Sequence, residues 1–110
     1  MGIIAKRPIA NGAWGTDVSP SAYADEYFRR AKLMIEVGEI PDATSDRIDL
    51  ALGFVLAHSA VNTAIVGTRN LRHLQSNISM AESQNYLSDS AVGELVRRFN
   101  SLDDGWYQLE

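Results

Sequence analysis

The sequence predicts an α/β fold with two short parallel strands and about four helices. Two short runs of apolar residues, near 3–5 and over 61–66, are typical of buried strands. Segments whose apolar residues recur at helical spacing lie between these runs and after them. Strands joined by helical crossovers pair in parallel through a right-handed connection. The 110 residues are enough for one domain, expected over 1–110, with one ordinary core.

Composition is that of a globular domain and argues against several functions. Hydrophobic residues make up 45% and charged residues 22%, unlike a disordered chain. The net charge of -4 argues against a nucleic-acid partner. The chain has no cysteine, which removes disulfides, thiol catalysis and Cys-type zinc sites and fits a cytoplasmic location. No apolar run approaches the roughly 18 residues of a membrane span, and residues 1–8 do not resemble a signal peptide.

The first strand and the first helix have clear boundaries in the sequence. The strand is expected over 3–5 and ends before Pro8, because proline cannot donate to a β ladder. The helix is expected to begin at Ser19 and Pro20, since serine caps helices and proline suits the first helical turn. Gly38 is a typical helix terminator.

A second helix and a second strand follow. The helix is expected to begin near Thr44, with Asp46 in its first turn, where the helix dipole favours an acid. Its apolar residues cover so much of its circumference that we expect it to pack on more than one side. His58 follows the helix and suits a C-terminal capping role. Residues 61–66 are mostly β-branched and apolar and predict the second strand.

Two more helices are expected after that strand. Asn70 is a suitable N-cap for the first of them, and Ser88 is expected to begin the second. The apolar residues on one face of the first are Leu71, Leu74, Ile78 and Ala81. The predicted order is therefore strand, helix, helix, strand, helix, helix.

The turn over 66–70 is the most informative place for chemistry, because a strand ends there and a helix begins. The first N–H groups of a helix have no intrahelical partner, and the helix dipole adds positive charge at that end. The residues there that suit a phosphate or nucleotide are Gly67, Thr68, Arg69, His73, Ser76 and Asn77. An ordinary strand-to-helix turn with a capping asparagine and a solvated arginine explains the same residues, and spacing alone favours this second interpretation, because such turns are common.

Lys6 and Arg7 follow the first strand, at the end of a parallel sheet where ligands bind. They either meet an anion or simply mark the end of the strand. Alternation along a strand sends them to opposite sides, which argues against both reaching one phosphate. The two histidines have no neighbouring carboxylate pattern, so we expect no metal site.

Several stretches resemble the C-terminal part of the aldo-keto reductases. They are ALGFVLAH over 51–58, VNTAIVGTRN over 61–70 and HLQSN over 73–77. The stretch IIAKRPIANG over 3–12 is similar to that family's seventh barrel strand and the loop after it. The closing DGW over 104–106 resembles the tail of one bacterial branch of the family.

The resemblance implies an eight-stranded (β/α) barrel that reduces carbonyls with NADP(H). Residues 67–69 match the family's adenosine-phosphate loop, and Asn77 matches the asparagine that faces the adenine. His73 stands where many members have an arginine directed at the 2′-phosphate, and Ser76 where many have an acid, which leaves NAD or NADP open. The implied cofactor-binding positions, including three that line the pyrophosphate near the first strand, are Arg7, Ile9, Asn11, Gly67, Thr68, Arg69, His73, Ser76 and Asn77.

The family's catalytic Asp, Tyr, Lys and His come from its first four strands, which have no counterpart here. We therefore expect a truncated, aldo-keto reductase-like barrel fragment that is not catalytic by itself, since 110 residues are less than half of the roughly 250 in a complete barrel. A two-stranded parallel sheet is marginal alone, and its edges carry unpaired backbone groups. We expect a homo-oligomer or a complementing chain to cover them. The alternatives are a dinucleotide- or phosphate-binding module and a structural interaction protein.

Overall fold

The computed structural model of the protein describes residues 1–84 and 86–109. In this part of the chain, strands β1 (Ile4–Lys6) and β2 (Thr63–Ile65) form a two-stranded sheet. They run parallel, with Ile4 opposite Thr63 and Lys6 opposite Ile65. The predicted α/β class and the parallel pairing are therefore confirmed, although each strand differs from its predicted range by one or two residues.

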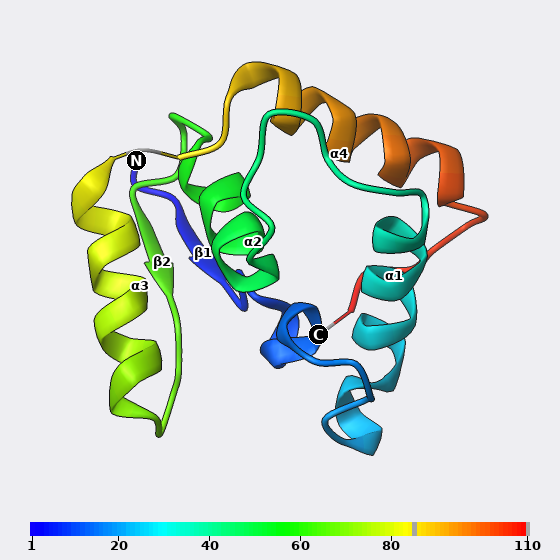
Figure 1. Ribbon diagram of the computed structural model, residues 1–110, viewed down its shortest axis with the longest axis horizontal. Coiled ribbons are helices and arrows are strands. Elements are labelled where there is room, and N and C mark those ends of the chain that lie inside the picture. The colour runs from blue at the N-terminus through cyan, green and yellow to red at the C-terminus, as the bar shows by residue number, and fades with distance from the viewer. Residues whose placement is uncertain (85, 110) are drawn as a thin grey trace.

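The helices follow the predicted order (Figure 1). Helices α1 (Asp25–Glu36) and α2 (Arg47–Leu56) lie between the strands in sequence. Helices α3 (Leu71–Ser83) and α4 (Asp89–Leu102) follow β2. Two short 3₁₀ segments, η1 (Ala10–Gly15) and η2 (Ala22–Ala24), connect β1 to α1. None of the helices in the described residues is long and apolar enough to cross a bilayer.

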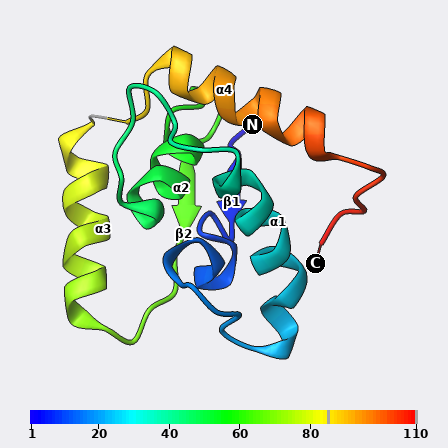
Figure 2. The ribbon, with the colours of Figure 1, turned by 45° about the vertical axis from the view of Figure 1, so that its right-hand side comes forward.

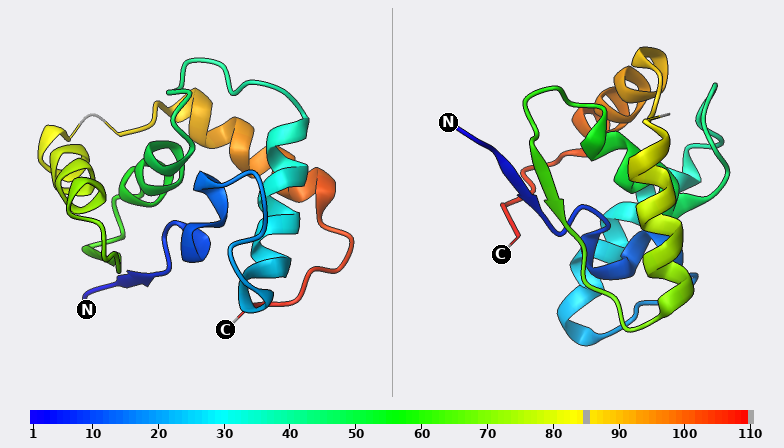
Figure 3. Two further views of the ribbon diagram at one scale, coloured as in Figure 1. Left: turned by 60° about the horizontal axis from the view of Figure 1, so that its bottom comes forward. Right: turned by 90° about the vertical axis from the view of Figure 1, so that its left-hand side faces the viewer.

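The helices cover only one face of the sheet. Figure 3 (right) shows α2 and α3 on one side of the two strands and the other side uncovered. Ala5 and Ala64 are half-buried, whereas the other strand residues are exposed, as the alternation of a strand requires. The residues of this open sheet face are Ile4, Thr63 and Ile65, while Lys6, at the end of β1, lines a cavity among the helices. Ile4 is 64% and Ile65 59% exposed, so the open face presents two large apolar side chains.

The hydrophobic core lies among the helices. Met34 from α1, Leu50 from α2 and Leu95 from α4 form its buried centre. Segment η1 packs against both α1 and α2 (Figure 2). Helix α2 buries four consecutive residues, 50–53, which confirms the prediction that it packs on more than one side. The core thus forms away from the sheet, and little of the protein's stability depends on the two strands.

Side-chain caps begin three helices, two of them at the predicted residue and one near it. Asn70 accepts a hydrogen bond from the Arg72 N–H (2.9 Å) and Ser88 accepts one from the Ala91 N–H (3.2 Å), so both predicted caps are confirmed. Asp46, expected inside the second helix, is instead its N-cap and accepts from the N–H groups of residues 48 and 49. The cap uses a side-chain oxygen, which requires Asp46 to stay outside the first turn.

The first helix begins later than its serine-proline pair predicts. Ser21 caps η2 by accepting from the Ala24 N–H (3.3 Å), and α1 continues from there at Asp25. The Ser19 hydroxyl donates to the Asp25 carboxylate and to the Ser21 carbonyl instead of capping a helix directly. At the other end Gly38 adopts φ 125°, which confirms it as the terminator.

Candidate functional site

Both strands end at the same edge of the sheet. Lys6 and Ile65 are the last paired residues, so Arg7 and the turn over 66–70 leave this strand-end edge side by side. Arg7 has φ 56°, and its carbonyl accepts from the Ala10 N–H (2.9 Å), which turns the chain into η1. This left-handed residue ends the strand at Lys6, and Lys6 and Arg7 both line one cavity. The argument from strand alternation therefore does not apply to this pair, because Arg7 lies outside the strand.

The turn after β2 is held by short hydrogen bonds of its own. The Thr68 hydroxyl accepts from the Asn70 N–H (3.1 Å), and Asn70 then caps α3. A Cβ placed on Gly67 would meet nothing within 4 Å, so the backbone there is open to approach by a ligand. Residues 67–69 are all exposed. These features fit a phosphate loop and also fit an ordinary turn.

The remaining predicted site residues lie apart from one another. His73 and Asn77 are four residues apart and share one face of α3, with His73 exposed and Asn77 half-buried. Ser76 lies toward α2 and lines a cavity there. Ile9 is half-buried and precedes η1, and Asn11 is exposed at φ 57° within it.

The cations without an ion pair in the described residues lie at or after the carboxyl ends of the two strands in the sequence. Six of the ten Lys and Arg residues form ion pairs with carboxylates. Over residues 1–84 and 86–109 the other four form none: Lys6, the last residue of β1, and Arg7, Arg69 and Arg72, which come after a strand. Cations that no carboxylate neutralises favour an anionic ligand in a chain whose net charge is -4.

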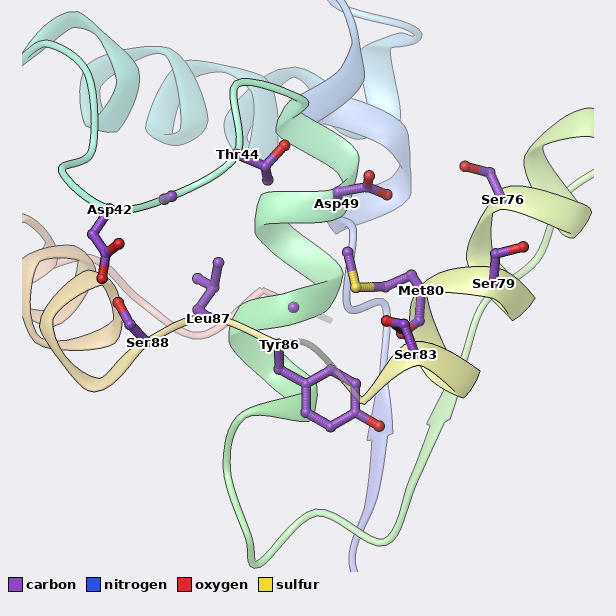
Figure 4. Close-up of a pocket in the computed structure, with 12 residues that line it drawn as sticks. Asp42, Thr44, Asp49, Ser76, Ser79, Met80, Ser83, Tyr86, Leu87 and Ser88 are labelled. Carbon is purple, nitrogen blue, oxygen red and sulfur yellow. Dashed lines mark hydrogen bonds between the residues drawn. The ribbon is translucent and has the colours of Figure 1, made fainter.

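The larger cavity lies between α2 and α3 and has a volume of about 790 Å³ (Figure 4). Its polar lining consists of carboxyl and hydroxyl groups, and Met80 extends from α3 toward α2. Burial raises the pKa of the Asp49 carboxyl above its ordinary value, and the nearby Asp46 carboxylate raises that pKa further. Residues lining this cavity, called the α2–α3 cavity, are Asp42, Ala43, Thr44, Asp49, Gly53, Ser76, Ser79, Met80, Ser83, Tyr86, Leu87 and Ser88.

A second cavity, called the β1-end cavity, has a volume of about 470 Å³ and lies among the end of β1, η1, α1, α2 and α4. Apart from two cations its lining is apolar. The residues are Lys6, Arg7, Pro8, Trp14, Met34, Leu50, Ala51, Phe54, Val55, Leu95, Val96 and Phe99. Lys6 and Arg7 stand out in the sequence, but the apolar walls of the cavity do not, because these walls come from segments distant along the chain.

His58 has a structural role. Its Nδ1 lies 2.7 Å from the Phe54 carbonyl oxygen, and its ring packs edge-on against the Phe54 ring at 4.8 Å between centroids. The predicted capping role at the end of α2 is confirmed. Within the described residues no three His, Cys, Asp or Glu side chains are grouped to hold a metal ion.

No protein-family model matches the chain, and no curated protein matches its sequence. The resemblance to aldo-keto reductases therefore stays an expectation from the stretches 3–12, 51–58, 61–70, 73–77 and 104–106.

Proposed function

We propose that the chain is a C-terminal portion of a barrel related to the aldo-keto reductases, and that it binds the phosphates of NADP(H). The observation on which the proposal depends is that the cations without an ion pair in the described residues, Lys6, Arg7, Arg69 and Arg72, all lie at or after the carboxyl end of a strand. A dinucleotide brings several phosphate charges, and arginine is well suited to pair with them. We further propose that the protein works in the cytoplasm, which a chain without cysteine fits.

The open sheet face supports the barrel half of the proposal. In a (β/α)₈ barrel the helices cover the outer face of the strands, and bulky branched side chains fill the interior. Here the small residues Ala5 and Ala64 lie on the helix side. Ile4, Thr63 and Ile65 are branched and lie on the open face. This division of large and small side chains is what one stretch of a barrel wall requires.

The turn over 66–70 supports the cofactor half. It leads into the N-terminus of α3, where unpaired N–H groups and the helix dipole attract phosphate. Gly67 leaves the backbone accessible, and Arg69 is exposed and has no ion pair in the described part of the chain. If the cofactor is NADP rather than NAD, we propose that His73, exposed one turn further along α3, meets its 2′-phosphate.

The chain alone is proposed to bind without catalysing carbonyl reduction. The family's four catalytic residues belong to strands with no counterpart in these 110 residues. His58 is no substitute for them, because its Nδ1 is engaged with the Phe54 carbonyl. Without a positioned proton donor, hydride transfer to a carbonyl lacks its general acid.

Calorimetric titration with NADP⁺ and NAD⁺ tests the proposal. Arg69→Ala is expected to weaken binding about tenfold or more, since hydrogen bonds to charged groups contribute roughly 1.5–3 kcal/mol. Gly67→Ala is expected to weaken binding without changing stability, because its added methyl has free space in the protein but blocks a phosphate. Arg97→Ala, an exposed arginine on α4, is the control. If neither nucleotide binds at millimolar concentration, the proposed function is wrong.

A second candidate function, self-association or complementation by another chain, is favoured by the exposed apolar surfaces. Helix α3 buries none of its residues, so its apolar stripe at Leu71, Leu74 and Ile78 is exposed together with the open sheet face. Exposed apolar surface marks interaction sites, and open sheet edges accept further strands.

Sedimentation velocity over a range of concentrations tests this second candidate. The wild-type chain is expected to self-associate, and Ile65→Lys on the open sheet face is expected to remain monomeric. Val18→Lys, at an exposed apolar position outside the sheet, is the matched control and is expected to behave as the wild type. A wild-type chain that stays monomeric throughout rules out a second copy as the covering partner.

A further inference from the structure

The β1-end cavity combines a buried apolar floor with an accessible mouth. Met34, Leu50 and Leu95, the centre of the core, form its floor. Val96 and Phe99 of α4 also line it and are 42% and 44% exposed, so the cavity reaches the surface beside them. Its volume of about 470 Å³ lies within the roughly 300–1,000 Å³ of small-molecule sites.

Three aromatic rings from three different segments line this cavity. They belong to Trp14 of η1, Phe54 of α2 and Phe99 of α4. Phe54 packs edge-on against His58, and Phe99 packs edge-on against Trp106 at 5.4 Å between centroids. These contacts hold two of the rings in position from outside the cavity. Aromatic walls of this kind favour an aromatic ligand, because offset and edge-to-face ring pairs add to the gain from burial.

The only charged groups that line the cavity are cationic. Lys6 and Arg7 lie where β1 ends, and neither forms an ion pair in residues 1–84 and 86–109. An apolar pocket with a few convergent polar groups orients its ligand through those groups. A ligand that fits both the aromatic walls and the two cations has an apolar aromatic body and one anionic end. A carboxylate suits that end, because its two oxygens match the two parallel N–H groups of arginine.

We propose that the β1-end cavity is a binding site for a small aromatic carboxylate. The ring of the ligand enters among Trp14, Phe54 and Phe99, and its carboxylate pairs with Lys6 and Arg7. The cavity contains no residue of the turn over 66–70, but it shares Lys6 and Arg7 with the cations proposed to meet the dinucleotide phosphates. It goes beyond the proposed function, because its aromatic lining and its ligand are different.

Calorimetry with 4-phenylbutyrate and with its uncharged analogue 4-phenylbutanol tests the site. The carboxylate is expected to bind one to one and about tenfold to a hundredfold tighter than the alcohol, as expected for hydrogen bonds to charged groups. Lys6→Met and Arg7→Met are expected to remove most of this preference while the alcohol binds as before. Lys6 is exposed, so its replacement leaves the core intact. Arg69→Met, an exposed cation outside the cavity, is the matched control and should change neither affinity.

A variant that fills the mouth of the β1-end cavity tests whether the probes bind inside this cavity. Val96→Trp introduces a bulky ring at an exposed position of the cavity lining and is expected to abolish binding of both probes. Backbone amide shifts of the wild-type chain with 4-phenylbutyrate are expected to concentrate on η1, α2 and α4, which tests the location without any substitution.

Four results would overturn the proposal. The first is that neither probe binds at millimolar concentration, and the second is that both probes bind equally and Lys6→Met changes neither affinity. The third is that binding survives Val96→Trp, because the probes then bind elsewhere on the protein. If neither probe binds and Val96→Trp instead changes the association state of the chain, the cavity is a contact between proteins.

Discussion

The guanidinium of Arg98 donates a hydrogen bond to the main-chain oxygen of Met34 at 3.0 Å, across 64 residues of sequence. The same guanidinium donates to the carbonyls of Gly38 (2.6 Å) and Glu39 (2.9 Å), and Glu94 accepts from it at 2.8 Å. Arg98 is only 3% exposed. A buried cation on α4 therefore caps the C-terminal end of α1, where carbonyls lack helical partners and the dipole favours positive charge.

Replacing Arg98 with methionine is expected to lower the free energy of unfolding by about 3 kcal/mol, because buried carbonyls lose their donors. Urea denaturation measures the change. Arg97→Met is the control, since Arg97 also bonds Glu94 but is exposed, and it should have little effect. Equal losses in the two variants would show that the contact with α1 is unimportant.

The stability of the protein is expected to fall in acid through Glu94. Its hydrogen bonds with Arg97 and Arg98 lower the pKa of the Glu94 carboxyl from 4.5 to about 2. A carboxyl whose pKa is lower in the folded state stabilises the protein at pH above its unfolded pKa. That contribution is lost as the pH falls from 4.5 toward 2.

Urea midpoints measured from neutral pH down to about pH 2 test this sign. Glu94→Gln should flatten part of the acid dependence. Glu26 offers a parallel case, because its hydrogen bonds with Arg29 and Arg30 lower its pKa to about 2 as well. The double variant Glu26→Gln/Glu94→Gln should flatten the dependence of the urea midpoint on pH further. If this dependence is unchanged in both the single and the double variant, the lowered pKa values of Glu94 and Glu26 do not explain the loss of stability in acid.

The elements of this fold could be predicted from sequence where a local interaction determines them. Asn70 and Ser88 cap helices with their own side chains, and Gly38 ends one through its own backbone, so all three are visible in the sequence. Ser19 gives a wrong helix start, because Ser21, two residues later, is the cap. Nothing in the neighbouring sequence distinguishes the two serines.

The features that could not be predicted depend on contacts between distant segments. Arg98 looks like a surface residue in the sequence, beside Arg97 in the same local pattern with Glu94. Only the packing of α4 on α1 separates a buried arginine from an exposed one. The α2–α3 cavity and the β1-end cavity are likewise invisible along the chain, because each is lined by several elements.

Two glycines are expected to respond to alanine in opposite ways. Gly93 lies within α4, and a Cβ there meets nothing within 4 Å. Gly93→Ala should stabilise the protein by about 0.5–1 kcal/mol through helix propensity. A Cβ on Gly15 would lie 2.7 Å from Ile48 Cδ1, so Gly15→Ala should destabilise by about 1–3 kcal/mol. Thermal and urea unfolding of both variants measure the difference, and a shared sign would contradict the packing.

Asn70 separates the stability of α3 from anion binding at the strand-end edge. Asn70→Ala removes the acceptor of the Arg72 N–H and should cost about 1 kcal/mol of stability. Asn70→Asp keeps an acceptor and so should keep the stability, but it adds a negative charge beside Arg69 and Arg72. If phosphates bind there, Asn70→Asp should weaken NADP⁺ binding in calorimetry more than Asn70→Ala does. The reverse order would mean that the cap, and not the charge, governs binding at this edge.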